Sequence, residues 1–323
     1  MTDKNLKNDT NLTTNHQSDE ATADKALFIS EWKVDAGEKL YFPTQGREGT
    51  IVIDWGDGSS DTISSGDDAY ISHEYSKGGV YTIKVDGMIT KWSCEFDSDD
   101  DDRIRSNSKK LIRILSYGKT SFGPYTFKHA SNLTSLPENE SPRFFENSMK
   151  GVFYGASSFN QSINHWNTSN VTNMHEMFHG AESFNKPLND WNTSNVTDMS
   201  EMFSGASSFD QPLNDWNTSN VTDMHYMFQF ASLFDQPLDK WDVSNVTDMN
   251  GMFDGAMCFN QPLDKWGISD VTDLSEMIDD EDASNADEMF TSVWRVDSNE
   301  SLFFPIQGLR YPCFGKHRQL ILE

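Results

Sequence analysis

The chain has 323 residues, of which 36% are hydrophobic and 12% aromatic, so it can bury a core in two or three domains. Its 51 acidic residues outnumber the 25 basic ones, and the formal net charge of -26 would repel phosphate backbones and anionic membranes. We therefore expect no nucleic-acid partner, and without about 18 consecutive apolar residues we expect no membrane insertion.

The N-terminal part changes character twice. Residues 1–25 are polar and contain almost no large apolar groups, which predicts a disordered tail without the apolar core of a signal peptide. Residues 26–92 contain the strand-like runs KLYFP, TIVIDW, AYISHEY and VYTIKVDG between glycine-containing turns, which predicts a small all-β module.

Two acidic segments of this part are candidate calcium sites. Asp54, Asp57 and Asp61 surround the sequence WGDG and could hold calcium, although a turn without metal is the favoured interpretation. The run DSDDDD lies within 93–108 and lacks EF-hand spacing, so a solvated acidic linker is favoured there. Residues 109–148 are expected to form an irregular N-terminal cap for the repeats that begin at residue 149.

Five copies of a 25-residue unit fill residues 149–279. The unit reads approximately MFxGAxSFNQPLNDWNTSNVTDMSE, and one copy is too short to enclose a core. Successive copies are expected to stack, so that their aromatic columns become continuous ladders. The expected structural core contains Trp166, Trp191, Trp216, Trp241 and Trp266, with Phe178, Phe203, Phe228 and Phe253.

The residues of one unit predict its local structure. Val196, Met199 and Phe203 have the spacing of one helical face, and Gly205 is a suitable helix stop. The following SFDQPLNDW predicts a short strand that Pro212 limits, and NTSN predicts a turn. The expected fold class is therefore an α/β repeat, a solenoid of strand-turn-helix coils preceded by the all-β module.

Two resemblances to known families arise from these motifs. The sequence NVTDMxxMFxGAxxFNQPLxxW, nearly intact at 195–216 and 220–241, resembles the BspA-like family of bacterial leucine-rich-repeat surface proteins. WGDG at 55–58, followed by Tyr75, Gly79 and Tyr81, resembles the polycystic-kidney-disease (PKD) type of immunoglobulin-like sandwich. The resemblances imply a leucine-rich-repeat-like solenoid behind a PKD-like sandwich, a secreted or cell-surface location, and adhesion.

The polar pair before each tryptophan is the candidate ligand-binding surface, because it lies on the expected strand face and differs between units; simple solvation is the alternative. These residues are Asn164, His165, Asn189, Asp190, Asn214, Asp215, Asp239, Lys240, Asp264 and Lys265. His175 and His179 are four residues apart on the expected helix, a geometry that zinc can use. Other units carry Ser or Gln there, so solvent-facing variable positions are favoured over a metal site.

The C-terminal segment 280–323 repeats an earlier sequence. FTSVWRVDSNESLFFPIQG at 290–308 matches FISEWKVDAGEKLYFPTQG at 28–46, but no WGDG comes after it. We interpret this segment as a linker and an incomplete second β module, left by truncation or a frameshift.

No motif in the chain predicts catalysis. GxSxG, a phosphate loop and HExxH are absent, and the three cysteines have no CxxC spacing. We expect no enzymatic activity and no cofactor, with calcium as the remaining candidate. The expected function is non-enzymatic surface interaction or adhesion, binding an extracellular protein or glycan through the solenoid face. The alternative is a structural spacer with no ligand, and a cytoplasmic location stays open because no export signal is apparent.

Overall fold

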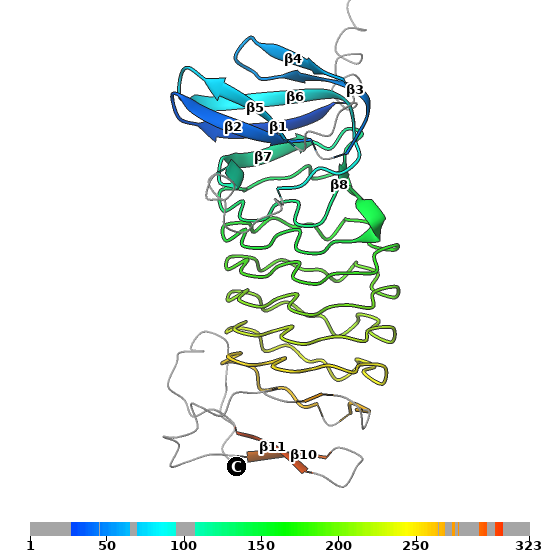
Figure 1. The fold of residues 1–323 in the computed structure, drawn as a ribbon. Helices are drawn as coiled ribbons and strands as arrows, with labels where there is room; N and C mark the ends of the chain where they lie inside the picture. Colours follow the sequence, from blue (N-terminus) through cyan, green and yellow to red (C-terminus); the bar gives the residue numbers. More distant parts are fainter. Residues whose placement is uncertain are drawn as a thin grey trace, which may run out of the picture.

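A β module stands at one end of a column of stacked coils (Figure 1). The computed structural model describes residues 27–44, 46–64, 70–94, 107–263, 265–268, 273, 274 and 277, and the backbone of 291–295 and 301–305. The expected tail at 1–25, the acidic run at 97–102 and Asp264 lie outside the described residues.

The β module consists of a five-stranded antiparallel sheet of order β4-β3-β6-β1-β7 and a two-stranded antiparallel sheet, β2-β5. Alternation along β3 shows why these residues form strands: Ile51 and Ile53 are fully buried, while Val52 between them is 40% exposed. The strands are β1 (Phe28–Val34), β2 (Glu38–Pro43), β3 (Arg47–Asp54), β4 (Ser60–Ile63), β5 (Tyr70–Tyr75), β6 (Gly79–Ile89) and β7 (Leu111–Ser116).

Strand β7 joins the module to the coils. It pairs with β1 on one side, and on the other Arg113 forms a parallel bridge with Ser135 in the first turn of the column. The sheet therefore continues beyond 26–92 into the segment expected to be a cap. One continuous cluster of buried apolar residues runs from Phe28 to Met277, so module and column share a core.

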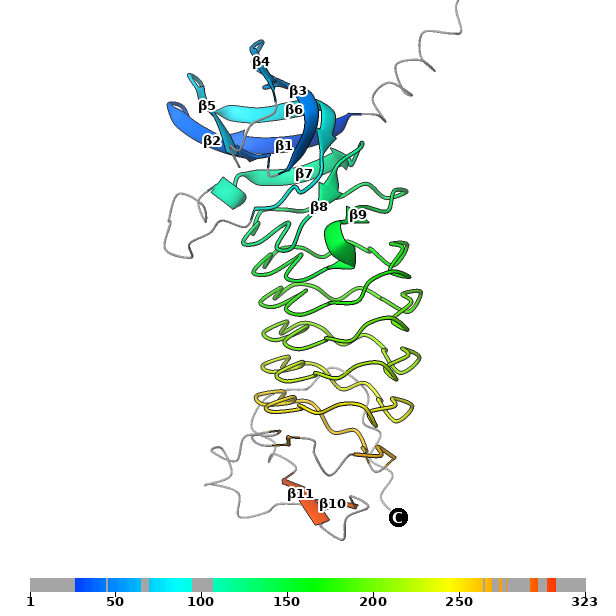
Figure 2. The same ribbon diagram turned by 45° about the vertical axis from the view of Figure 1, so that its right-hand side comes forward.

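Backbone hydrogen bonds along one side of the column hold each coil to the next. Glu201 N donates to His225 O at 2.8 Å, and Gly205 N donates to Gln229 O at 2.7 Å. The amides between them alternate between closing turns within their own coil and bonding to the following coil. Single-residue parallel bridges stack in register beside these contacts, and they join Ser148, Asn173, Asp198, Asp223, Asp248 and Asp273 in succession. A second view shows the same regular stack (Figure 2).

The prediction of a helix in each unit is wrong, because no helix occurs in the described coils between residues 149 and 263. The predicted α/β class and the strand-turn-helix solenoid are therefore wrong as well. Met199 O accepts from Met202 N within one turn, and Phe203 N then bonds to Met227 O of the following coil. Glu201 has φ 54°, which an α-helix does not permit. Consecutive turns produce the same three-residue apolar spacing as a helix, which explains the error.

The aromatic columns form the core of the stack. Phe178 and Phe203 lie with ring centroids 5.4 Å apart and nearly parallel, and the Trp columns are likewise stacked. Trp216 is 4% exposed, and its Nε1 donates to Leu188 O of the preceding coil at 3.1 Å. The other predicted core residues are also buried: Trp166, Trp191, Trp241, Trp266, Phe228 and Phe253.

The remaining elements are short. They are β8 (Ser121–Phe122), β9 (Arg143–Phe144), the 3-10 helix η1 (Phe145–Asn147), β10 (Thr291–Arg295) and β11 (Ser301–Pro305). β10 and β11 pair with each other as an antiparallel hairpin. The matching N-terminal sequence forms β1 and β2, which instead belong to different sheets.

Candidate functional site

Contacts between coils occupy most of the polar pairs before the tryptophans. Asn164 Nδ2 donates to Asp190 Oδ2 at 2.7 Å, and Asn214 Nδ2 donates to Asp239 Oδ1 at 2.8 Å. The lysines form ion pairs across coils, Lys240 with Asp215 at 2.7 Å and Lys265 with Asp239 at 2.6 Å. His165 Nε2 contacts Glu140 O at 3.0 Å, and Asn189 is exposed. These side chains help to hold neighbouring coils in register.

The three candidate calcium carboxylates support the turn after β3 in the β module. Asp54 accepts from Gly56 N at 2.9 Å, and Asp61 accepts from Trp55 Nε1 at 2.8 Å. Asp57 accepts from Ser59 N and contacts His73 Nε2 at 2.8 Å. The hydrogen bond from Ser59 and the nearby His73 lower the pKa of Asp57 to about 2. Each carboxylate thus has its own protein partner, and the three do not converge on one point.

One side of the column differs most from coil to coil, and we call it the variable face. It is the outward side of segment 149–155 and of its equivalents 174–180, 199–205, 224–230 and 249–255. The Trp, Phe, Met and Ala columns elsewhere stay nearly constant. Four columns define the variable face: Lys150, His175, Ser200, His225 and Asn250; Gly151, Glu176, Glu201, Tyr226 and Gly251; Tyr154, His179, Ser204, Gln229 and Asp254; and Gly155, Gly180, Gly205, Phe230 and Gly255.

Two of these columns require left-handed backbone. Gly151 and Gly251 have φ 58°, and the same column holds Glu176, Glu201 and Tyr226 at φ 50° to 55°. A left-handed conformation costs a non-glycine residue about 1–2 kcal/mol. Large side chains therefore occupy positions where glycine would remove the strain, and such outliers concentrate at functional sites.

Histidine and glutamate side chains meet in the middle of the variable face. His175 Nε2 lies 3.2 Å from Glu176 Oε2, and Tyr125 donates its hydroxyl to the same oxygen. Glu201, one coil further on, lies beside His179, with Nδ1 and Oε2 3.4 Å apart. The side chains of His175 and Glu176 are 17% and 16% exposed, so the cluster is accessible but largely covered.

The histidines and glutamates of this cluster shift one another's pKa values. Burial raises the pKa of Glu176, but hydrogen bonds from His175 and Tyr125 outweigh burial and hold that pKa at about 2. Burial lowers the pKa of His175, and the contact with Glu176 more than reverses the effect, so the net shift is upward. The His179 ring holds the pKa of Glu201 below its usual value. Both carboxylates are therefore ionised at neutral pH.

A second group lies one coil further along the column. His225 Nδ1 is 2.7 Å from Asp223 Oδ1, and Asp248 is close enough to bind the same metal ion as these two residues. Among the described residues, this group and His175, Glu176 and Glu201 are the ones whose donor atoms converge closely enough to hold a metal ion.

Exposed apolar side chains lie at and beside the part of the variable face that the fourth coil contributes. Phe230 is 54% exposed at φ 54°, in a column where the other coils have glycine. Leu233 of the same coil is 48% exposed, and Met257 of the next coil is 47% exposed. The Phe230 ring covers Gly255 of the next coil on one side and is open to solvent on the other. Contiguous exposed apolar side chains are typical of interaction sites.

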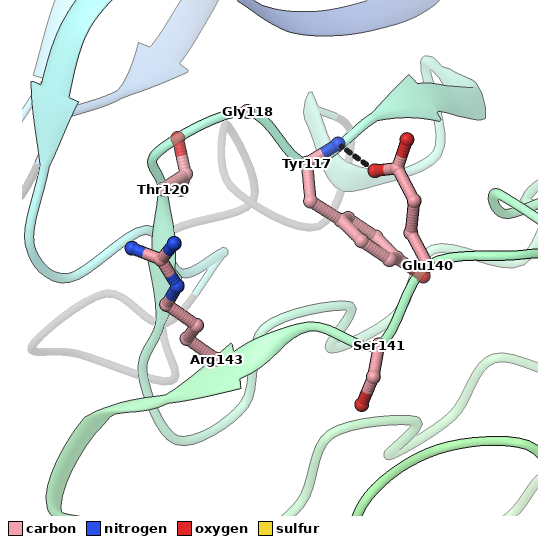
Figure 3. A pocket seen from close by; sticks show the side chains of 6 residues that line it. All are labelled: Tyr117, Gly118, Thr120, Glu140, Ser141 and Arg143. Carbon is pink, nitrogen blue, oxygen red and sulfur yellow. Dashed lines mark hydrogen bonds between the residues drawn. The ribbon is translucent and has the colours of Figure 1, made fainter. Parts of the chain in front are cut away.

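A small hollow of about 320 Å³ lies where the β7 to β8 turn meets the chain before η1 (Figure 3). Tyr117 N donates to Glu140 Oε2 at 3.2 Å across it, and Arg143 lines the opposite part. Burial raises the pKa of the Tyr117 hydroxyl, which stays protonated. The hollow assembles no nucleophile with an adjacent base.

Comparison with known proteins gives one family. The family described as "Mycoplasma protein of unknown function, DUF285" matches residues 145–232 and 211–306, which together span half of the chain. The chain belongs to this family. No curated protein and no solved structure matches it. The DUF285 match covers all of the coils that the structure describes from residue 149 onward.

The identification as a BspA-like leucine-rich-repeat protein with a PKD-like sandwich is therefore wrong. The family found is DUF285, and the coils carry turns and single-residue bridges where a leucine-rich-repeat unit of the expected kind would carry a helix and a strand. The shared motif reflects repeat length and apolar spacing, which turn-based coils reproduce. Among the described residues, no helix has the length and apolar character needed to cross a membrane.

Sequence reasoning missed the grouping of His175, Glu176 and Glu201. On a helix, His175 and His179 would share one side, which favoured that pair instead. In the stacked coils, Glu176 and Glu201 occupy the same position one coil apart, and the 25-residue spacing is the signal that could have brought them together.

Proposed function

We propose that this DUF285 protein is a non-enzymatic binding protein that docks an extracellular protein or glycan on the variable face. The observation that carries the proposal is the location of variation. Coils that are nearly identical in their core differ in charge, aromatic content and apolar exposure along this one side. Repeat proteins recognise partners through surface residues that differ between repeats, while constant residues maintain the stack.

The chemistry of the variable face supports binding. It passes from Lys150 and Tyr154 through the histidine and glutamate cluster to the exposed Phe230. Aromatic side chains with polar and charged neighbours are typical of protein interfaces. Ser200 Oγ lies 2.7 Å from His175 Nδ1 on this face, but Ser200 is 1% exposed and donates its hydroxyl proton to Asp198. Burial raises the pKa of the Cys94 thiol, in the β module, to about 12, which makes it unreactive.

The test is binding of the purified full chain to arrays of glycans and extracellular proteins, with two matched variants. The first variant combines His179→Ser, Gln229→Ser and Phe230→Gly. Each substitution installs the residue that the coil of Ser204 and Gly205 carries at the same position. The second variant, Lys240→Asp with Lys265→Asp, changes the edge beside the tryptophans. It replaces the lysines before Trp241 and Trp266 by the aspartate that precedes Trp191 and Trp216.

We expect the wild-type chain to bind at least one array component, the variable-face variant to lose that binding, and the edge variant to retain it. Loss in the edge variant alone would move docking to the edge beside the tryptophans and contradict the proposal. Absence of binding to every component would favour the alternative, a spacer without a ligand, which the near-identity of the core columns also fits.

A further inference from the structure

We propose that the variable face holds one divalent transition-metal ion, of the zinc class, between His175, Glu176 and Glu201. This inference goes beyond the docking proposal, because a metal site here does not require a partner. One imidazole nitrogen and two carboxylate oxygens are donors that zinc binds, and three protein ligands with one open position are common for this ion. Two carboxylates also balance its charge.

The donor atoms are spaced as such an ion requires. Ligands at 2.0–2.1 Å in a tetrahedron lie about 3.3 Å from one another, and His175 Nε2 is 3.2 Å from Glu176 Oε2. Donor atoms of all three residues lie within 4.8 Å of one another. Modest rotation of the Glu201 side chain, which is 25% exposed, would bring its oxygen closer.

The second observation is the hydrogen bonding of the other nitrogen of His175. Ser200 Oγ donates to Asp198 Oδ1 at 2.6 Å, so the Oγ is left to accept from His175 Nδ1, which is 2.7 Å away. Ser200 O, which can only accept, is also 3.2 Å from Nδ1. Nδ1 therefore carries a proton, and Nε2, which is directed toward the glutamates, is the nitrogen that an ion would take in place of a proton. Metal-binding histidines are oriented in this way by donating their second N–H.

Carboxylates of both donor groups accept hydrogen bonds, and Glu176 Oε2 accepts one from Tyr125. The groups differ in their histidine: Ser200 holds Nδ1 of His175 and leaves Nε2 for an ion, whereas His225 directs Nδ1 itself at Asp223. In that second group, Asp223 Oδ1 already accepts from both the backbone N and the ring Nδ1 of His225. Asp248 Oδ1 accepts from Asn250 N. His225 Nε2 points toward Glu201 Oε1 at 3.6 Å, so this histidine flanks the proposed site rather than forming a separate one.

The experiment measures zinc binding to the untagged full chain by isothermal titration calorimetry against a competing chelator. His175→Ser and Glu201→Gly are the test variants, because each installs the residue that another coil carries at the same position, namely Ser200 and Gly151. Asp248→Asn is the matched control in the second group. Thermal unfolding with and without zinc provides a second readout, since a bound ion raises the unfolding midpoint.

We expect one zinc ion per chain, an affinity lower by about tenfold or more in each test variant, and unchanged binding in Asp248→Asn. The zinc-dependent rise in unfolding midpoint should disappear in the same two variants. Equal affinity in wild type and both test variants would overturn the proposal, as would loss of binding in Asp248→Asn alone. A wild-type chain without saturable zinc binding would overturn it as well.

Discussion

At the scale of single residues, backbone conformation decides which side chains the variable face can display. The left-handed columns accept glycine without strain, yet they hold Glu176, Glu201, Tyr226 and Phe230. Tyr226 covers the glycine of the next coil: a Cβ on Gly251 would lie 2.1 Å from its ring. A Cβ on Gly205 would meet nothing closer than 3.5 Å. Gly251 is thus required both for its left-handed conformation and for space, whereas Gly205 is required for its conformation alone.

This difference predicts unequal costs for alanine. Gly205→Ala should lower the free energy of unfolding by about 1–2 kcal/mol, through backbone strain alone. Gly251→Ala should cost more because its methyl group also meets the Tyr226 ring, and it should cost less in a Tyr226→Gly background. Urea denaturation of the four variants measures this, and equal costs for both glycines would contradict the packing described.

The turn after β3 predicts a pH effect. The pKa of Asp57 is lowered from 3.8 to about 2 in the folded chain, so its stabilising contribution is present above about pH 4 and is lost as the pH falls toward 2. Asp57→Asn should unfold at a lower temperature than wild type at pH 6, and the difference should shrink between pH 4 and 2. Thermal unfolding at several pH values measures this, and a difference independent of pH would refute it.

At the scale of the elements, the 25-residue unit is a turn-based coil whose stability comes from stacking. The Trp and Phe columns could be predicted from periodicity alone, because buried aromatic residues must recur wherever identical coils stack. The local backbone could not, since Val196, Met199 and Phe203 have a spacing that consecutive turns and a helix share. The left-handed conformation of Glu201 is what distinguishes consecutive turns from a helix. Its only signal in the sequence is the glycine at the same position of other coils.

The stacked tryptophans predict a large effect of truncation in the middle of the column. Trp216→Ala should lower the free energy of unfolding by about 3–5 kcal/mol, because it leaves a cavity in the core. It also leaves Leu188 O without its hydrogen bond from Nε1. Trp216→Phe should cost less, since a ring still fills much of the space. Chemical denaturation gives both values, and a loss below about 1 kcal/mol for the alanine variant would be inconsistent with the stacked core.

At the scale of the whole molecule, the β module and the column form one structure. β7 bonds to β1 in the sheet and, through Arg113 and Ser135, to the first turn of the column. This continuity could not be predicted from the sequence, because the intervening acidic run suggested two separate domains. The 25-residue repeat begins after β7 and contains no signal for a strand that pairs back to the module.

The shared core predicts cooperative unfolding. Tryptophan fluorescence, which reports on Trp32 and Trp55 in the module as well as on the column, should give the same transition midpoint as far-UV circular dichroism. Separate transitions would show that module and column fold independently, contrary to the pairing of β7.

The central claim is that constant columns hold the stack together while the variable face is available for binding. Its most direct test is the free energy of unfolding of the His179→Ser, Gln229→Ser and Phe230→Gly triple variant, measured beside Trp216→Ala. We predict a change of at most about 1–2 kcal/mol in the triple variant, because His179 and Gln229 are only partly buried, surface substitutions cost little, and Phe230→Gly relieves strain. A loss as large as that of Trp216→Ala would show that the variable residues are structural, and would contradict the claim.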